Sequence, residues 1–411
     1  MVTTRALESL RADLEAAPSI HVVAAGKAAA GMAAAADRAI GARVRRGIVT
    51  IAPGAAPLPG ELGSQWTAIE TTHPLPSAGS ETAGRAALAL ADAVARGPRS
   101  EDELLLVCLS GGASSMLAVP ARGLTIEDKA AATAVLLQAG LDIADLNLVR
   151  RHMSAIKGGR LAAHAARSIT LAISDVAGAG VDEPAVIGSG PTVGDRSPRK
   201  DAYALLVERK LLWRLPRRVI AHVGSRADDD PPVPPDDPRL RQAAYWIVAS
   251  RRDAMRQAAS TAARLGYDTH VIDAPLSGRA RDGWRHVLGD ARAVRRPRCV
   301  IASGETTVEV RGAGRGGRNQ ELAVGALSAL AAMGDAALAS INTDGVDGPT
   351  DAAGAIVDST TLSVLGSDAA GVCEDALARN DAYPLLESLG ALVRTGPTGT
   401  NVGDLVVAVL Q

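Results

Sequence analysis

A repeated order of apolar strand, glycine-containing turn and helix constrains the fold of this chain more than any other feature. Residues 20–24 form a buried strand by composition, and Gly26 and Lys27 lead from it into an alanine-rich helix that runs to about Ile40. Apolar strands predicted at 104–109 and 169–173 also end in small polar residues. This alternation predicts an α/β fold, in which ligands bind at the carboxyl ends of the strands.

The length of 411 residues predicts two domains. A polar, proline-rich connector at 228–238 is the clearest break in composition, and we place the domains at 1–235 and 236–411. Hydrophobic residues make up 47% of the chain and aromatic residues 2%, with no Phe, so Ala, Val and Leu must fill the cores. Further strands are predicted at 47–51, 67–70, 245–249, 267–272, 337–341 and 405–410, and further helices from about 79 and 125, at 251–265 and at 279–294.

Charge and cysteine content exclude several classes of protein. The formal net charge of −1 leaves no broad basic field, which argues against a general nucleic-acid or membrane-surface binder. The longest apolar run, 28–36, is far shorter than the ~20 residues of a membrane-spanning helix. The N-terminal segment is a charged amphipathic helix without a signal-peptide core. Three scattered cysteines outside metal-binding spacing indicate a reducing compartment, so we expect a cytoplasmic protein.

The segment 303–322 carries the densest chemistry. A strand predicted at 306–311 precedes its glycines, and a helix is predicted from Asn319. Its closely spaced glycines and arginines are Gly312, Gly314, Gly316, Gly317, Arg315 and Arg318. Glycine backbone can approach a ligand and point several N–H groups at it, and guanidinium groups grip phosphate or carboxylate through paired hydrogen bonds. The segment therefore predicts an anion site, with a solvated basic turn as the alternative.

The same glycines match the dinucleotide-binding pattern G-x-G-x-x-G at 312–317. Asp335 lies near the distance expected of an acid that binds the ribose. A first Rossmann strand, however, is covered on both faces and is almost wholly apolar. The strand predicted before these glycines carries Glu309 and Arg311 on one face. We therefore interpret the segment as an anion clamp rather than as a nicotinamide site.

Other candidate ligand groups follow predicted strands in the first half. Lys27 would stand at a helix N-terminus, where anions are favoured, although a solvated lysine is the alternative. His73, in the turn 72–76, is either catalytic or held by a structural hydrogen bond. Residues 110–115 form either an anion cradle or a tight turn with serine caps. Asp175 follows the strand at 169–173, where an acid suits Mg²⁺ or a substrate hydroxyl.

Two charged stretches complete the set. A basic edge at 147–160 contains Arg150 and Lys157, and it faces either a ligand or solvent. The loop at 342–351 places three carboxylates beside glycines, which suggests a cation or polyhydroxyl site rather than an EF-hand, because no Glu closes the loop.

Taken together, these segments resemble the class II glycerate kinases of the MOFRL family. The resemblance covers the chain from about residue 20 to the end. The first-half blocks are G-K-A at 26–28, T-H-P-L-P at 72–76, S-G-G-x-S at 110–114, N-x-V-R-x-H at 147–152, K-G-G at 157–159, S-D-V at 174–176 and S-G-P-T at 189–192. The second-half blocks are S-G-E-T-T from 303, G-x-G-x-G-G-R-N-Q-E from 312, T-D-G-x-D-G-P-T-D-A-A-G from 343 and G-P-T-G-T-N-V-x-D-L from 396. Ala113 in the cradle and the short connector at 228–238 depart from the family pattern and bear on loop geometry.

The resemblance implies ATP-dependent phosphorylation of D-glycerate to 2-phosphoglycerate with Mg²⁺. It also implies a larger Rossmann-like three-layer domain and a smaller α/β domain that enclose a cleft. Small-molecule substrates, D-glycerate and ATP, are the partners it implies, and a homodimer is left open. Members of this family have often been labelled hydroxypyruvate reductases, so a nicotinamide-dependent reductase is one alternative and a non-catalytic glycerate or nucleotide sensor is another.

Site roles are assigned on this basis. Lys27, Arg318 and Asp175 are the expected catalytic residues. Nucleotide contacts are expected from Gly111, Gly112, Ser114, Ser115, Lys157, Gly190, Thr192, Gly314, Gly316 and Gly317. Substrate contacts are expected from Arg150, Glu305, Asn319 and Asp344. Metal ligands are expected from Asp175, Asp344 and Asp347.

Overall fold

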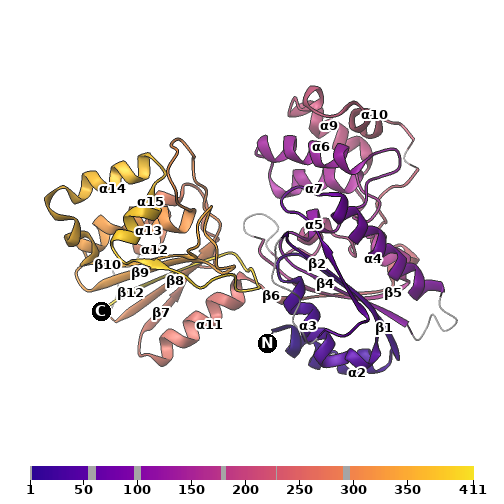
Figure 1. The fold of residues 1–411 in the computed structure, drawn as a ribbon, viewed down its shortest axis with the longest axis horizontal. Helices are drawn as coiled ribbons and strands as arrows, with labels where there is room; N and C mark the ends of the chain where they lie inside the picture. The colour runs from indigo at the N-terminus through magenta and orange to yellow at the C-terminus, as the bar shows by residue number, and fades with distance from the viewer. Residues whose placement is uncertain (1, 54–61, 97–102, 177–181, 228, 290–296) are drawn as a thin grey trace. The chain divides into compact units, whose positions relative to one another are not determined.

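The structure is a computed structural model that describes residues 2–53, 62–96, 103–176, 182–227, 229–289 and 297–411. The chain divides into two compact units, one built mainly from residues 1–248 and the other mainly from residues 249–411. Each unit is an α/β domain with its own six-stranded sheet, as the sequence predicts (Figure 1). No helix among the described residues is both long and apolar enough to cross a membrane.

The first unit is organised around a sheet with the strand order β3-β2-β1-β4-β5-β6. β1 to β5 pair in parallel with their neighbours. The strands are β1 (Ser19–Ala25), β2 (Val44–Ile51), β3 (Trp66–Glu70), β4 (Glu103–Leu109), β5 (Arg167–Ile173) and β6 (Gln242–Ala249). Every residue of β4 is buried, because this central strand is covered on both faces.

Helices cover this sheet on both sides (Figure 1). They are α1 (Val2–Ser9), α2 (Arg11–Glu15), α3 (Ala29–Ile40), α4 (Ala78–Arg96), α5 (Ala113–Met116), α6 (Ile126–Gln138), α7 (Ile143–His152), α8 (Arg160–Ala165), α9 (Arg199–Glu208) and α10 (Arg217–Val223). α6 begins where its sequence predicts, because Thr125 and Asp128 form a reciprocal capping box. The proline-rich connector precedes β6, the last strand of this sheet.

The second unit has a mixed sheet with the order β11-β10-β9-β12-β8-β7. Only β7 and β8 pair in parallel, and the other pairs are antiparallel. The strands are β7 (Asp268–Val271), β8 (Arg298–Gly304), β9 (Ala336–Asn342), β10 (Gly354–Asp358), β11 (Leu392–Val393) and β12 (Asp404–Leu410). The helices are α11 (Arg251–Arg264), α12 (Trp284–Leu288), α13 (Arg318–Ala331), α14 (Ala369–Ala378) and α15 (Ala382–Ser388).

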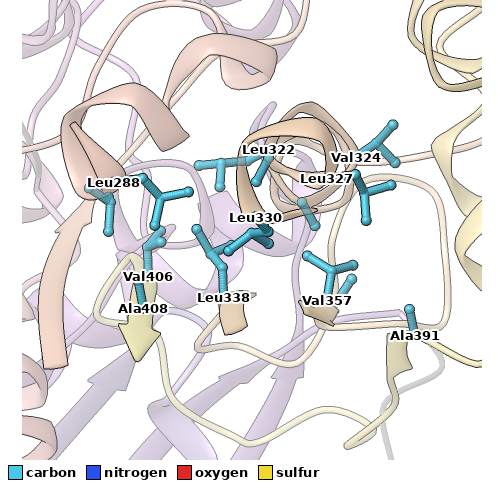
Figure 2. Packing of buried hydrophobic residues seen from close by; sticks show 14 of the residues in the cluster. Leu288, Leu322, Val324, Leu327, Leu330, Leu338, Val357, Ala391, Val406 and Ala408 are labelled. Carbon is cyan, nitrogen blue, oxygen red and sulfur yellow. The ribbon is translucent and has the colours of Figure 1, made fainter. Parts of the chain in front are cut away.

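The core of the second unit lies between this sheet and α13. β9 and β12 alternate strictly between buried and half-buried residues, so every second side chain points toward the helix. Figure 2 shows Leu322, Leu327 and Leu330 of α13 packed over Leu338 of β9 and Val406 of β12. This packing fixes the N-terminus of α13 over one edge of the sheet.

Two predicted elements of the second unit are wrong. Residues 306–311 form no strand, and only Thr307 makes an isolated bridge, to Arg279. The reason is that neither face of this segment is covered by a core, since Val310 is 78% exposed and Glu309 forms surface ion pairs with arginines. The predicted helix at 279–294 is a short 3₁₀ turn followed by α12, with Gly283 between them. The end of that prediction lies outside the described residues.

The packing in Figure 2 predicts the effect of a core truncation. Leu327 is fully buried, so Leu327→Ala should lower the free energy of unfolding by about 2–5 kcal/mol through lost burial and a residual cavity. Val364 is 72% exposed, and Val364→Ala should change the free energy of unfolding by less than about 0.5 kcal/mol. Urea unfolding of both variants measures the difference, and equal effects would contradict the assigned core.

Candidate active site

The loops that follow β1 and β4 are bound to each other at the carboxyl edge of the first sheet. The Lys27 N–H donates to the Gly111 carbonyl at 2.8 Å, and the Ala28 N–H donates to Ser110 Oγ at 2.9 Å. Gly26 has a φ of +113°, and a Cβ there would lie 2.4 Å from Ser110 Oγ. Glycine is therefore required at this position, and the contact holds the backbone of Lys27 in place.

Lys27, His73 and Arg150 come together beside these loops. Desolvation, then Lys27 and then Arg150 lower the pKa of His73, which keeps the imidazole neutral near pH 7. Arg150 lies in the last turn of α7, and burial lowers its pKa to about 10. In the described part of the chain the Arg150 guanidinium makes no ion pair. Two cations around a neutral histidine form an electropositive edge that favours an anion.

Several residues with predicted nucleotide contacts form hydrogen bonds to other parts of the protein. Ser114 and Ser189 share a hydrogen bond of 2.7 Å, and Ser189 donates to Asn147 at 2.7 Å. Ser115 donates to the Gly112 carbonyl at 3.0 Å, and Thr170 donates to Thr192 at 2.8 Å. The Gly190 carbonyl accepts from the Gly159 N–H at 2.9 Å. These groups shape the loops, and their side chains have partners within the protein.

Lys157, expected to contact nucleotide, is buried, and a second buried lysine lies beside it. The Lys157 ammonium donates to the Gly188 carbonyl at 3.0 Å, and Lys129 donates to the Met153 carbonyl at 3.0 Å. Both side chains are 2% exposed. Burial, and next the charge of Lys129, lower the pKa of Lys157 well below its usual range. Lys157 therefore ties loops together in this structure.

Lys129 was not identified from the sequence. A signal existed, because Lys129 shares the buried face of α6 with Ile126, Thr133 and Leu136. Its ammonium also lies 3.4 Å from the Arg150 carbonyl, so it holds the C-terminal end of α7, on which Arg150 lies. Burial, then Arg150 and Arg160, lower the pKa of Lys129 to about 7.

In the second unit, Arg318 is held by two carboxylates. Its Nε and Nη2 donate to the two oxygens of Asp404 at 2.6 and 3.0 Å, and its Nη1 donates to Glu305 at 2.6 Å. Desolvation alone would lower the pKa of Arg318, but Asp404 and then Glu305 raise it above its usual range. Glu305 therefore contacts a predicted catalytic residue. Asp404 was not singled out from the sequence, because its partner lies 86 positions away.

Asp347 accepts hydrogen bonds from the first turn of α13. Its carboxylate accepts from the backbone N–H groups of Asn319 at 3.2 Å and Gln320 at 2.9 Å, and from Asn319 Nδ2 at 3.2 Å. Asn319 Oδ1 in turn accepts from Ser340 at 2.7 Å. Asp347 and Asn319 are 1% and 2% exposed. These contacts are structural, and the metal contact expected of Asp347 and the substrate contact expected of Asn319 stay predictions.

The glycine-rich loop packs against the chain that connects α14 and α15. A Cβ on Gly312 would lie 2.2 Å from the Arg379 carbonyl oxygen, and one on Gly314 would lie 2.6 Å from it. The Gly314 N–H donates to this carbonyl at 3.0 Å, and the Gly312 N–H donates to Asn380 at 3.0 Å. A Cβ on Gly317 would lie 2.3 Å from the Asp347 carboxylate. These glycines are needed for close approach within the protein.

Metal ligands were predicted at Asp175, Asp344 and Asp347. Across the described residues, no group of three or more His, Cys, Asp or Glu side chains is placed to hold a metal. Asp175 lies two residues after the end of β5, and Asp344 lies two residues after the end of β9; both are half-buried. Mg²⁺ usually takes only one or two protein carboxylates and completes its shell with water and phosphate oxygens. Asp175 and Asp344 therefore fit Mg²⁺ chemically, whereas Asp347 is engaged by α13.

Comparison with known proteins shows the family to which this chain belongs. Residues 2–224 match the model of a domain of unknown function, DUF4147, and residues 298–404 match the MOFRL family model. The D-glycerate 2-kinase of Thermotoga maritima is 34% identical over 95% of this chain and 90% of its own length. The chain belongs to the MOFRL family. The crystal structure of a Thermotoga maritima glycerate kinase gives a TM-score of 0.84 at 33% identity, over 100% of this chain and 95% of that one.

Names within the family differ. A protein of Agrobacterium vitis, provisionally named a hydroxypyruvate reductase, is 37% identical over 93% of this chain and 97% of its own length. The MOFRL match includes the glycine-rich loop, the acidic loop and Asp404. The chemistry of the site must therefore decide between a glycerate kinase and a hydroxypyruvate reductase.

The buried Lys129 predicts that the free energy of unfolding depends on pH. An unfolded lysine titrates near 10.5 and folded Lys129 near 7, so between these values the unfolded state binds more protons. Stability should therefore rise with pH from about 7 toward 10, by at most about 1.4 kcal/mol per pH unit for this group. Lys129→Met should flatten the rise in melting temperature, and the exposed Lys200→Met should not. An equal slope in all three proteins would contradict a buried, titrating Lys129.

The glycine loop predicts a contrast between two neighbouring positions. Gly312→Ala should lower the melting temperature by several degrees, because its Cβ would overlap the Arg379 carbonyl. Gly316→Ala should lower it less, because the nearest atom to its Cβ, the Ala382 amide nitrogen, is 3.3 Å away and needs only a small shift. Thermal unfolding of both variants measures this contrast. Equal effects of the two substitutions would contradict the close approach of Gly312 to the Arg379 carbonyl.

Proposed function

We propose that this protein transfers the γ-phosphoryl group of ATP to the 2-hydroxyl of D-glycerate, with Mg²⁺. The coarser part of this proposal, a glycerate kinase, follows from family members that carry this name and are at least 30% identical over nearly the whole chain. The nucleotide, the metal and the position of the phosphate on the product are the finer part. The nucleotide and the metal are proposed from the chemistry of the residues, and the 2-position is proposed from relatives named glycerate 2-kinase.

The observation that carries the proposal is the electropositive edge formed by Lys27 and Arg150. Both cations act on His73, and Arg150 has no carboxylate partner among the described residues. Arg150 is half-buried, so its charge is partly desolvated, and an anionic ligand that binds there would offset that cost. Phosphate and carboxylate are the anions that a lysine and a guanidinium suit, and ATP and glycerate carry both.

Phosphoryl transfer needs little more than positioning and positive charge around the transferred group. We assign Lys27 and Arg318 to that group, and Arg150 to an anionic group of a bound substrate. Mg²⁺, when bound by Asp175 or Asp344, would neutralise charge on the phosphate oxygens. We assign to a carboxylate the role of accepting a hydrogen bond from the substrate hydroxyl and orienting it. The neutral His73 ring beside Lys27 adds no charge to this edge.

The reductase alternative lacks the local structure that its motif requires. A dinucleotide fingerprint makes a tight turn directly from a strand into a helix. Here β8 ends at Gly304 and α13 begins at Arg318, so a long segment separates them. The glycines of the pattern contact Arg379 and Asp347 closely. The loop thus offers no cradle for a pyrophosphate of the Rossmann type.

Paired assays on the purified protein test the proposal. Mg-ATP with D-glycerate should release ADP, and the product should be consumed directly by added enolase, which acts on 2-phosphoglycerate. Hydroxypyruvate with NADH or NADPH should give no absorbance change at 340 nm. ADP release that requires phosphoglycerate mutase before enolase acts would contradict the 2-position. Nicotinamide oxidation without ADP release would overturn the kinase proposal.

A further inference from the structure

The ion pair between Arg318 and Asp404 joins two rigid elements of the second unit. Asp404 is the first residue of β12, which lies between β8 and β9 and pairs with Gly304 and Asn342 on either side. The alternation of β12 puts Asp404 on the face that α13 covers, together with Val406 and Ala408. Arg318 is the first residue of α13. The packing core therefore sets the separation of the two charges.

The two carboxylates on Arg318 lie in different environments. The Asp404 side chain is 6% exposed and accepts two hydrogen bonds, from Nε and Nη2. The Glu305 side chain is 54% exposed and accepts one, from Nη1. A bidentate contact from a buried strand residue fixes the plane of a guanidinium, whereas a single contact to an exposed glutamate is easily exchanged.

Electrostatics and burial decide which of the two carboxylates can release Arg318 when an anion binds. Two carboxylates on one guanidinium already give a net negative cluster, and a phosphate oxygen would add more negative charge. Glu305 can move into water, but Asp404 would remain buried and unpaired if it released Arg318. An incoming anion therefore replaces Glu305 at Nη1 and leaves the Asp404 contact intact.

We propose that Asp404 is the positioning residue for Arg318: it holds the inner edge of the guanidinium and presents the outer edge, with Nη1, to an anionic oxygen of the phosphoryl group. This inference rests on the proposed function, in which Arg318 acts at that group. Asp404 itself touches no substrate. Its effect is to fix a flexible side chain before the ligand arrives, which lowers the ordering cost at the reaction step.

Chemical rescue tests the proposal most directly. Arg318→Ala should lower turnover on the order of a hundredfold or more. Added guanidinium should restore part of that activity, because the Asp404 carboxylate can bind the free cation in place of the side chain. The double variant Arg318→Ala/Asp404→Asn should have the turnover of Arg318→Ala, since the two residues act as a unit, but guanidinium should not rescue it.

The single variant adds a kinetic signature. Asp404→Asn should lower turnover at least tenfold while the KM for glycerate changes less, because a misplaced guanidinium matters most in the transition state. Asp375→Asn is the matched control, since Asp375 makes a surface ion pair with Arg379 at 2.7 Å in the same unit. It should keep wild-type turnover. Thermal melts check folding, and the double variant removes both buried charges if Asp404→Asn alone does not fold.

The outcomes distinguish a failure of the proposed kinase function from a failure of the positioning role of Asp404. A wild-type protein that forms no ADP would overturn the proposed function together with this inference. An active wild type whose Arg318→Ala variant is impaired, but whose Asp404→Asn variant is not, would overturn the positioning role alone. Equal guanidinium rescue of Arg318→Ala and of the double variant would overturn it as well.

Discussion

The hydrogen bonds between Asp347 and the first turn of α13 are the contact on which the second unit depends. The N–H groups of a first helical turn have no partners within the helix, and a carboxylate there both accepts their hydrogen bonds and complements the helix dipole. Asp347 supplies this contact from the acidic loop after β9. Gly317 lets the carboxylate approach, since any Cβ would overlap it. The helix so anchored carries both the central apolar packing and, at its first residue, Arg318.

A different constraint organises the first unit, namely the burial of cations. Lys129 and Lys157 have lost nearly all contact with water, and each donates to main-chain carbonyls. Carbonyl dipoles stabilise an ammonium less than water does, which is why the pKa of each lysine falls. These contacts hold the end of α7 and the loop near Gly188, and Arg150 is the side chain placed by this framework. The basic stretch at 147–160 thus contains a buried lysine that supports the loops, Lys157, and an arginine without an ion pair among the described residues, Arg150.

Sequence patterns predicted the strands well and the contacts of the site less well. Apolar runs such as 104–109 became strands because burial on both faces leaves little choice of partner. The strand predicted at 306–311 rested on alternation alone, and the apolar face that this alternation defines is not covered, since Val310 is 78% exposed. Lys27 and Arg150 were candidate anion-binding residues in the sequence, but their common electrostatic effect on His73 could not be predicted from it. Asp404 and Lys129 were not identified from the sequence, because their roles depend on contacts with residues that are distant in the sequence and close only in the folded chain.

The glycine-rich segment shows why one pattern supports two names in this family. A dinucleotide fingerprint and this loop need glycine for the same reason, because backbone must pass within a distance that a Cβ would block. The glycine pattern indicates that the backbone passes close to another group, but it does not identify that group. In this protein the groups approached are the Arg379 carbonyl and the Asp347 carboxylate, both from the protein itself. A pyrophosphate would have to displace them, and the buried Asp347 would then lose its partners on α13. The glycines therefore indicate how Arg318 is presented, and they carry no evidence for a nicotinamide cofactor.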